Sequence, residues 1–439
     1  MRYLLIICLV IGKVFASTNI LFLSDIHFSP YLQCSAASCV TLGKLIESDI
    51  IYWPKILKND NSIQYKIETS NKLLTDGLTQ SSLFAKQSNV QNIFITGDIL
   101  THNFDSLFMK YAPTKLQNQQ ELTKFSLKTS AYVLAQVESA NKKANIFYVV
   151  GNNDGDNADY VIPSTGFLES MSLIMRQYLP IPNTVTQSFV KGGYYAAMLN
   201  KETMIIGLNS NLLSAINPNK DKALTQLQWL DNILAKAKEH KQHVILLQHI
   251  PYGIDMYKTA RTSLPTPIIV PVTSAILQQA YLKILDKYAD VISGIYAGHY
   301  HADYLALLQP SNIPVVGTLA LNSNFGNNPG FKILNLDTNG NLANYNAYIC
   351  NLNHNTILCE NGYQSSTLYG MNITKGIGSI SSDVGESRTI NYRKFYNGNN
   401  SLFPQPISDT QHWQYYFCAI NNVTMDSYSN CLAKFKPEN

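Results

Sequence analysis

The chain has 439 residues, of which 46% are hydrophobic and 14% are charged, with a formal net charge of +4. This length suffices for one large domain or two domains, and the hydrophobic content excludes an intrinsically disordered chain. The small net charge gives no support for a protein that binds nucleic acid or an anionic membrane surface.

Residues 1–16 have the pattern of a secretory signal peptide. Arg2 precedes an apolar run over residues 3–11, and residues 14–16 provide a small-x-small cleavage site. The run is too short to cross a bilayer, and no later stretch reaches about 18 apolar residues. We therefore expect cleavage after Ala16, export to a periplasmic or extracellular location, and no stable membrane anchor. Loss of the two basic residues in this segment lowers the net charge from +4 to +2. An uncleaved anchor is the alternative.

Short apolar runs then alternate with longer stretches of helical spacing. We predict buried strands at residues 19–24, 92–96, 145–150, 204–208, 243–248, 292–297 and 313–320. We predict helices at residues 64–79, 120–142, 222–240 and 273–289. In the third helix, the spacing places Leu224, Leu227, Leu230 and Leu234 on one face. Alternation of this kind is typical of an α/β domain.

The chain changes character near residue 350. Residues 331–350 read as a hairpin with its turn at 337–340, and the residues after it are rich in Asn, Ser, Gly and Tyr. We therefore expect a main domain over residues 17–350 and a small C-terminal subdomain over residues 351–439. No internal repeat is evident.

Six cysteines remain after the predicted signal peptide, and they fall into three pairs that are local in sequence. In an oxidising compartment we predict the disulfides Cys34–Cys39, Cys350–Cys359 and Cys418–Cys431. Only this local spacing favours the pairing. Zinc binding by cysteine is the alternative, although no Cys-x-x-Cys occurs.

Residue types that bind metals follow five of the predicted strands. Asp25 and His27 come just after the first strand, and residues at i and i+2 of an extended segment point to the same side. The complete set is Asp25, His27, Asp98, Asn152, His249, His299 and His301. Because ligands collect at the carboxyl ends of strands in open α/β sheets, we predict one shared site. Each residue alone has a simpler interpretation as a turn or a packed side chain.

The ordered set Asp-x-His, Gly-Asp, Gly-Asn, His and Gly-His-x-His resembles the calcineurin-like metallophosphoesterases over about residues 19–336. Three features are similar to the acid sphingomyelinase-like phosphodiesterase branch. They are His102 four residues after Asp98, "HIPYG" around His249, and "NNPGFKIL" at 327–334. The segment "WQYYFCAINNVTMDSYSNC" also resembles the cysteine-paired helical C-terminal region of that branch. The resemblance implies a four-layer αββα sandwich with a small helical subdomain held by disulfides.

The resemblance further implies two divalent metal ions, usually zinc in this family, that share Asp98. One ion would be held by Asp25, His27, Asp98 and His301. The other would be held by Asp98, Asn152, His249 and His299. Imidazole and carboxylate groups suit zinc, iron or manganese. Two such ions would activate a water lying between them for attack on phosphorus.

The proton donor departs from the family pattern. The histidine of the family's Gly-Asn-His motif is Asn153 here, and an amide can bond a phosphate oxygen but cannot shuttle protons. His102 matches the branch's other histidine and is the expected general acid, with an ordinary loop histidine as the alternative. The predicted catalytic residues are therefore His102, Asn153 and Asp98, with Asp154 as a partial substitute for the missing histidine.

The predicted substrate contacts are Asn103, Tyr252, Tyr300 and Asp154, and the aromatic rings, with Phe325, suit a base or choline. The first strand starts beside the predicted cleavage site, so we expect no saposin-like lipid-extracting domain. We therefore expect a secreted phosphodiesterase for small soluble substrates such as nucleotides or CDP-alcohols, with no affinity for a nucleic acid duplex. Sphingomyelin, polyphosphate and phosphomonoesters remain alternative substrates. A non-catalytic secreted binding protein on the same fold is the alternative of another class. The sequence indicates no oligomeric state.

Overall fold

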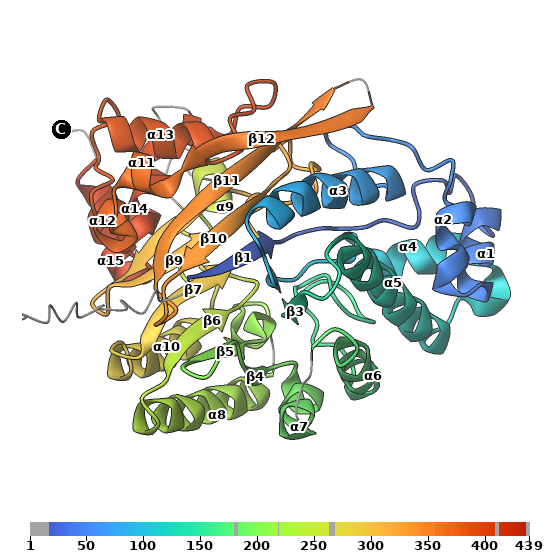
Figure 1. The fold of residues 1–439 in the computed structure, drawn as a ribbon, viewed down its shortest axis with the longest axis horizontal. Coiled ribbons are helices and arrows are strands. Elements are labelled where there is room, and N and C mark those ends of the chain that lie inside the picture. The colour runs from blue at the N-terminus through green and yellow to red at the C-terminus, as the bar shows by residue number, and fades with distance from the viewer. Residues whose placement is uncertain are drawn as a thin grey trace, which may run out of the picture.

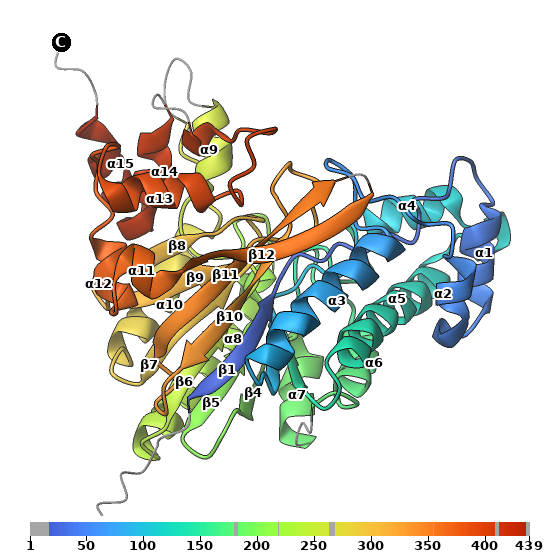
Figure 2. The same cartoon turned by 45° about the horizontal axis from the view of Figure 1, so that its top comes forward.

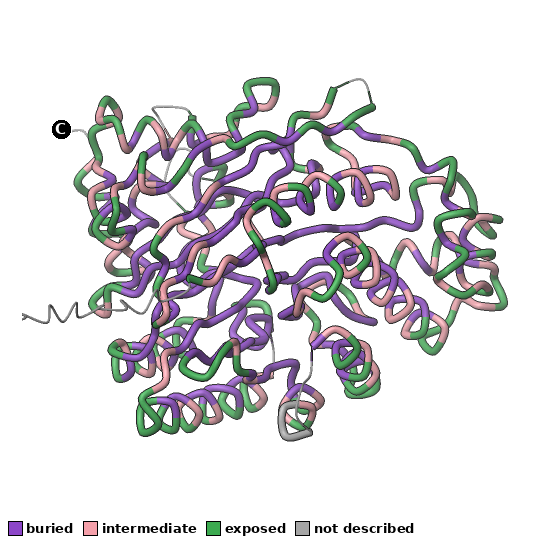
Figure 3. Tube along the Cα trace, in the orientation of Figure 1, coloured by how far each residue is buried: buried purple, intermediate pink, exposed green. Residues whose placement is uncertain are grey.

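The computed structural model describes residues 17–179, 183–217, 219–262, 268–353, 355–408 and 412–435. The predicted signal peptide lies outside the described residues. Within these ranges, two six-stranded sheets form the centre of the molecule (Figure 1). The central strands are buried, and exposed residues gather on the outer faces of the helices, on the loops and on the last two strands of the first sheet (Figure 3).

The first sheet has the strand order β12-β11-β10-β1-β2-β3. Its strands are β1 (Thr18–Leu23), β2 (Asn92–Ile95), β3 (Asn145–Tyr148), β10 (Gly330–Leu336), β11 (Leu342–Asn353) and β12 (Thr356–Gln364). β1, β2 and β3 are parallel, whereas β10 pairs antiparallel with β1. The carboxyl ends of β1, β2 and β3 therefore lie along one edge of this sheet.

The second sheet has the strand order β4-β5-β6-β7-β9-β8. Its strands are β4 (Tyr195–Met198), β5 (Thr203–Gly207), β6 (His243–Leu247), β7 (Ile292–Ala297), β8 (Leu305–Leu308) and β9 (Ile313–Gly317). The central strands β5, β6, β7 and β9 are parallel. The two sheets pack face to face, with Phe22 of β1 and Phe94 of β2 each 5.7 Å from the ring of Tyr296 on β7.

Helices cover the outer face of each sheet. α3 (Asn71–Gln87) packs on the first sheet with α5 (Gln119–Ala140) beside it, while α8 (Lys220–Glu239) and α10 (Ala275–Lys287) cover the second sheet (Figure 1). The result is the predicted four-layer sandwich. The remaining helices before the C-terminal region are α1 (Val40–Glu47), α2 (Trp53–Ile56), α4 (Phe104–Tyr111), α6 (Thr165–Met175), α7 (Asn183–Gly192) and α9 (Met256–Thr262). No helix in the described part of the chain is long and apolar enough to span a membrane.

All the strands and helices that we predicted are present, with bounds that differ by a few residues at several ends, and two of the differences from the prediction have a clear physical reason. The first predicted helix starts at Asn71 and not at residue 64, because Ser70 caps its N-terminus by accepting a hydrogen bond from Leu73 N–H. In α8, Leu224 is 50% exposed and does not share the buried face. Ala223, one helical turn before Leu227, occupies that face instead.

The C-terminal region begins with strands that belong to the first sheet. β11 runs through residue 350, and β12 pairs with it, so the sheet extends to Gln364. Five helices follow: α11 (Ser365–Tyr369), α12 (Ile373–Gly378), α13 (Ser387–Phe395), α14 (Trp413–Asn421) and α15 (Met425–Ala433). They gather with α9 at one corner of the molecule (Figure 2). The division into two domains stays a prediction.

The three predicted disulfides are all formed. Cys34–Cys39 closes a short loop before α1, Cys350–Cys359 links β11 to β12, and Cys418–Cys431 links α14 to α15. Two of the three therefore lie in or lead into the C-terminal region.

A buried ion pair joins the two sheets. Lys332 on β10 places Nζ 2.6 Å from Oδ1 of Asp303, in the segment between β7 and β8, and 2.5 Å from the carbonyl oxygen of Gly317. Tyr363 of β12 donates its hydroxyl to the other oxygen of Asp303. Lys332 is 1% exposed, and its burial lowers the pKa of the ammonium group.

Replacing this lysine should destabilise the fold strongly. Lys332→Met leaves Asp303 as a buried charge without its counter-ion, which costs about 3–5 kcal/mol of unfolding free energy. Urea denaturation followed by circular dichroism measures this cost. The control is Lys238→Met, which removes an exposed ion pair with Asp290 and should cost less than about 1 kcal/mol. Equal losses in the two variants would contradict the assignment.

Candidate active site

The seven predicted ligands meet at the adjoining carboxyl ends of strands from both sheets. Asp25 and His27 follow β1, Asp98 follows β2, and Asn152 follows β3. From the second sheet, His249 follows β6, and His299 and His301 follow β7. Because the sheets pack face to face, residues nearly 280 positions apart in sequence come into hydrogen-bonding distance.

The loops that carry these residues have unusual backbone conformations. Asp25, His27, Asp98, His299 and His301 have φ values of 50°, 46°, 53°, 75° and 53°. A left-handed conformation outside glycine costs about 1–3 kcal/mol per residue and persists only where the surroundings enforce it. Here the Asp25 N–H donates to the Gly97 carbonyl at 3.1 Å, and the His27 N–H donates to the Asp98 carbonyl at 2.9 Å.

Two glycines allow the loops to approach each other. A Cβ atom on Gly151 would lie 2.0 Å from Oδ1 of Asp98, and one on Gly298 would lie 2.0 Å from the hydroxyl of Ser24. Both contacts are far shorter than van der Waals distance. The glycines of the Gly-Asn and Gly-His motifs are therefore required by the packing of the ligand loops.

The ligand atoms form two clusters that share Asp98. In the first, His27 Nε2 lies 3.0 Å from His301 Nε2 and 3.4 Å from Asp98 Oδ2, and His301 Nε2 lies 3.5 Å from Asp25 Oδ1. These four residues are the set predicted for one ion.

In the second cluster, Asn152 Oδ1 lies 2.9 Å from both His249 Nε2 and His299 Nδ1. His249 Nε2 also lies 3.2 Å from Asp98 Oδ2. These residues are the set predicted for the other ion.

Backbone carbonyls orient two of the imidazoles. His27 Nδ1 lies 2.9 Å from the Leu100 carbonyl oxygen, and His249 Nδ1 lies 2.7 Å from that of Thr96. Because a carbonyl oxygen only accepts, each Nδ1 carries a proton, and Nε2 of each ring is the nitrogen that faces Asp98. This arrangement is usual for histidines that bind a metal.

The charges in the clusters suit a cation. Burial lowers the pKa of His27 and His301 and raises that of Asp25 to about 7. For His249, burial lowers the pKa, but the carboxylates of Asp98 and Asp25 outweigh it and raise the value to about 9. Converging carboxylate and imidazole groups of this kind, in which burial disfavours the cationic form of His27 and His301, fit divalent metal ions.

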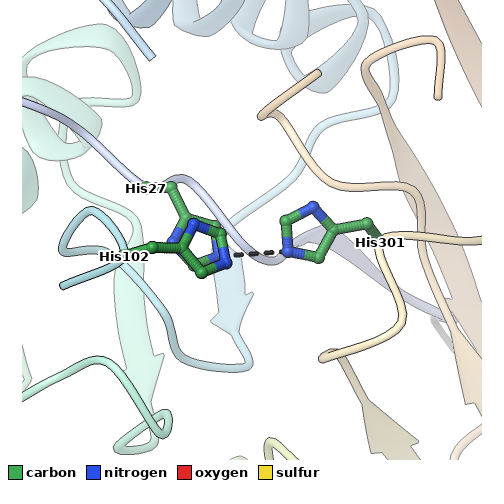
Figure 4. Close-up of side chains that lie close together, drawn as sticks. All are labelled: His27, His102 and His301. Atoms are coloured by element: carbon green, nitrogen blue, oxygen red, sulfur yellow. Dashed lines mark hydrogen bonds between the residues drawn. The ribbon is translucent and has the colours of Figure 1, made fainter. Parts of the chain in front are cut away.

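His102 lies on the solvent side of the first cluster. Its ring stacks on His27, with centroids 3.9 Å apart and planes 8° apart, while His301 faces the pair (Figure 4). The side chain is 20% exposed, whereas His27 is fully buried. Its Nδ1 lies 2.8 Å from Oε1 of Glu68. Burial lowers the pKa of His102, but the hydrogen bond to Glu68 and its charge outweigh this and raise it.

Glu68 is fixed in turn by two amides. Asn322 donates to its Oε2 at 3.0 Å, and Asn324 donates to its Oε1 at 2.9 Å. Our sequence reasoning missed Glu68. It lies in an irregular segment 34 residues before His102, and no motif signals its position.

Asn153 and Asp154 both act on the Asp98 loop. Asn153 donates its backbone N–H to Oδ1 of Asp98 at 2.8 Å and its side-chain amide to Oδ2 at 2.6 Å. The carboxylate of Asp154 is 2% exposed and accepts from the backbone N–H groups of Asp98, Ile99 and Leu100, at 2.7, 2.8 and 3.1 Å. Its oxygens also accept from a backbone N–H and a tyrosine hydroxyl. The predicted substrate contact of Asp154 is not present: the carboxylate is buried, it does not line the cavity, and three of its five hydrogen bonds hold the Asp98 loop from behind.

A cavity of about 240 Å³ opens above the clusters. Tyr300 and Phe325 line it, as does His102. Tyr252 does not: it is 3% exposed and stacks on Tyr281 at 4.0 Å, as part of the core. Asn103 is exposed at the start of α4 and is not among the residues that line the cavity.

Several further lining residues were not predicted from the sequence as site residues, although Asn327 lies in the "NNPGFKIL" motif. They are Asp159, Tyr160, Asp255, Tyr257, Lys258, Asn327, Tyr396, Asn397 and Gln405. The last three belong to the C-terminal region, so the residues after β12 complete the wall of the cavity. Burial raises the pKa of Asp159 to about 6.

The chain is similar to known proteins over much of its length. The family model of calcineurin-like phosphoesterases matches residues 18–303. The cyclic GMP-AMP phosphodiesterase SMPDL3A of Rattus norvegicus is 23% identical to this chain. The alignment covers 82% of this chain and 88% of the rat protein. Sphingomyelinase phosphodiesterase D of Dictyostelium discoideum is 23% identical, and the alignment covers 98% of this chain and 97% of that protein. A dimetal phosphatase from Danio rerio aligns with a TM-score of 0.44 and 12% identity, covering 78% of this chain and 98% of that one.

The family match begins at β1 and contains all seven predicted ligands, from Asp25 to His301. The curated relatives agree with the predicted acid sphingomyelinase-like branch. The family implies divalent metal ions, and two groups of converging side chains could hold one: Asp25 with His27 and Asp98, and His27 with His102 and His301. The chain therefore belongs to the calcineurin-like phosphoesterase family and is a metal-dependent phosphoric ester hydrolase.

Proposed function

We propose that this protein is a secreted phosphodiesterase with two zinc ions, acting on small soluble phosphodiesters or phosphoanhydrides such as nucleotides and CDP-alcohols. The observation that carries the proposal is the pair of ligand clusters sharing Asp98 beneath a cavity of about 240 Å³, with His102 on its wall. Export is supported by three disulfides, which persist in oxidising compartments.

When bound, the two ions supply Lewis-acid activation of water and neutralise the charge of the phosphate group. Zinc is our choice because the ligand atoms are imidazole nitrogens together with carboxylate and amide oxygens. Asp98 serves both clusters, and the two N–H groups that Asn153 donates to it fix the orientation of its carboxylate. Asn153 thus orients a ligand in the position where the family's histidine would move a proton.

His102 delivers the proton to the departing oxygen. Its Nδ1 is held by Glu68, which leaves Nε2 free to point into the cavity. The stack on His27 fixes the plane of the ring beside the first cluster. Tyr300 and Phe325 supply aromatic surface for the organic part of the substrate.

The names of the relatives favour a diester substrate. The rat protein is named a cyclic GMP-AMP phosphodiesterase, and the Dictyostelium protein a sphingomyelinase phosphodiesterase. A phosphomonoesterase is the alternative.

Purified protein should cleave bis-p-nitrophenyl phosphate at least about tenfold faster than p-nitrophenyl phosphate, by kcat/KM. A diesterase stabilises a transition state with one fewer ionised oxygen, so the dianionic monoester is the poorer substrate. Release of p-nitrophenolate measures both rates. A preference for the monoester would replace the diesterase proposal with the phosphomonoesterase.

Metal content should follow the two clusters. Wild-type protein should hold about two zinc ions per chain, and Asn152→Ala should hold about one, because that side chain serves only the second cluster. Asp98→Ala should lose both, because its carboxylate serves both clusters. Elemental analysis after dialysis measures the content, with the exposed Asn61→Ala as the control. Full zinc content in Asp98→Ala would contradict the shared-ligand assignment.

Loss of the general acid should depend on the leaving group. His102→Ala should lower kcat about 10²–10³-fold for a diester with an alkoxide leaving group, and by less than about tenfold for p-nitrophenolate, which departs without a proton. Glu68→Ala should show the same dependence with a smaller loss, because His102 remains but is no longer oriented.

The double variant Glu68→Ala/His102→Ala separates positioning from folding. It should be no slower than His102→Ala alone, because Glu68 acts through the histidine. His240→Ala, an exposed histidine bonded to its own helix, is the matched control. Equal losses for both leaving groups in His102→Ala would remove it from the acid role.

A further inference from the structure

We propose that a groove beside the catalytic cavity binds a second phosphate, carried by the leaving group of the substrate. The inference rests on the proposed function and narrows it. The preferred substrates are phosphodiesters or phosphoanhydrides whose departing half is itself phosphorylated, such as nucleoside polyphosphates.

The groove is continuous with the catalytic cavity. It encloses about 830 Å³ and shares Tyr257, Phe325 and Gln405 with the cavity wall. Its other side is formed by residues after β12, including Phe403. A substrate bound over the clusters can therefore extend into the groove without leaving the protein surface.

The groove lies on the leaving-group side of the site. The ring of Phe325 stands edge-on to His102, with centroids 5.4 Å apart, and to His301 at 4.7 Å. A general acid is placed beside the oxygen that departs, so the part of the substrate attached to that oxygen lies next to His102. From there, Phe325 leads directly into the groove.

The charge of the groove differs from that of the cavity. Lys66 and Arg261 line the groove, and none of its described lining residues is an Asp or Glu. The catalytic cavity, by contrast, has Asp159 and Asp255 on its wall, and its one lining lysine, Lys258, lies 3.5 Å from Asp255.

Neither cation of the groove forms an ion pair among the described residues. Lys66 Nζ lies 4.3 Å from the ring centroid of Phe403, and Arg261 bonds to the hydroxyl of Tyr257. Two cations without carboxylate partners attract a phosphate and repel a cationic group such as choline.

The aromatic rings suit a planar group next to that phosphate. Phe325 is 48% exposed, which is unusual for so large an apolar side chain, and Tyr257 and Phe403 flank it along the groove. Stacking on such rings is tolerant of base identity. A leaving group that is a nucleotide therefore fits both the rings and the cations of the groove. A chain of phosphates without a base would contact only the cations.

The test compares substrates with and without a second phosphate. For Lys66→Ala/Arg261→Ala, kcat/KM for ATP should fall about tenfold, mainly through KM, because the charge contacts bind ground state and transition state alike. Bis-p-nitrophenyl phosphate carries no second phosphate, so its kcat/KM should stay within about twofold of wild type. In wild type, added NaCl should weaken turnover of ATP more than that of the diester, and the double variant should reduce this difference.

The double variant Lys236→Ala/Lys238→Ala is the matched control, because it removes two exposed positive charges from α8, on the outer face of the second sheet. Tripolyphosphate forms the third arm. If Lys66→Ala/Arg261→Ala loses kcat/KM for ATP alone, the groove binds a nucleotide. If it loses kcat/KM for both ATP and tripolyphosphate, the groove binds any second phosphate. No loss for either, or an equal loss for the diester, would overturn the proposal. If wild type fails to cleave the diester, the proposed function fails independently of the groove.

Discussion

The carboxylate of Asp98 is the group on which both halves of the site depend. It belongs to the first sheet, yet it lies within 3.4 Å of imidazoles from both sheets. It holds this position through a left-handed backbone, two N–H donors from Asn153, and a loop anchored from behind by Asp154. A buried carboxylate shared in this way joins the two sheets, because it contacts His27 of the first sheet and His249 of the second. The same contacts therefore stabilise both the fold and the site.

The three successive residues Asn152, Asn153 and Asp154, which follow β3, have different roles because of where each lies relative to the Asp98 loop. Asn152 faces the second cluster, Asn153 orients Asp98, and Asp154 accepts hydrogen bonds from the loop that carries Asp98. A substitution in this short stretch therefore changes a ligand, its orientation or its support, depending on the position. The family's histidine could be replaced by Asn153 without loss of a ligand because the ligand is the residue before it.

The sequence identified candidate site residues that follow a local pattern. It did not identify those that tertiary packing brings to the site from distant parts of the chain. The seven predicted ligands could be brought together from the sequence because each sits just after an apolar strand, and parallel strands place such ends together. Glu68 and Tyr396 could not be found, because Glu68 contacts His102 from an irregular segment and Tyr396 reaches the cavity from the C-terminal region. Asp154 was assigned to substrate because its neighbours are ligands, whereas its burial and its bonds are tertiary features. Tyr252 was misjudged for the same reason, since a tyrosine near a ligand in sequence can still pack into the core.

Part of the cavity wall comes from a stretch of the chain that contains none of the predicted ligands. Every predicted ligand precedes residue 302, whereas Tyr396, Asn397 and Gln405 close the cavity from far downstream. Mutations in that later segment can reshape the wall and the groove without touching a ligand. That part of the wall is thus encoded apart from the predicted ligands, while Tyr257 and Tyr300 shape the same wall from the stretch in which the ligands lie.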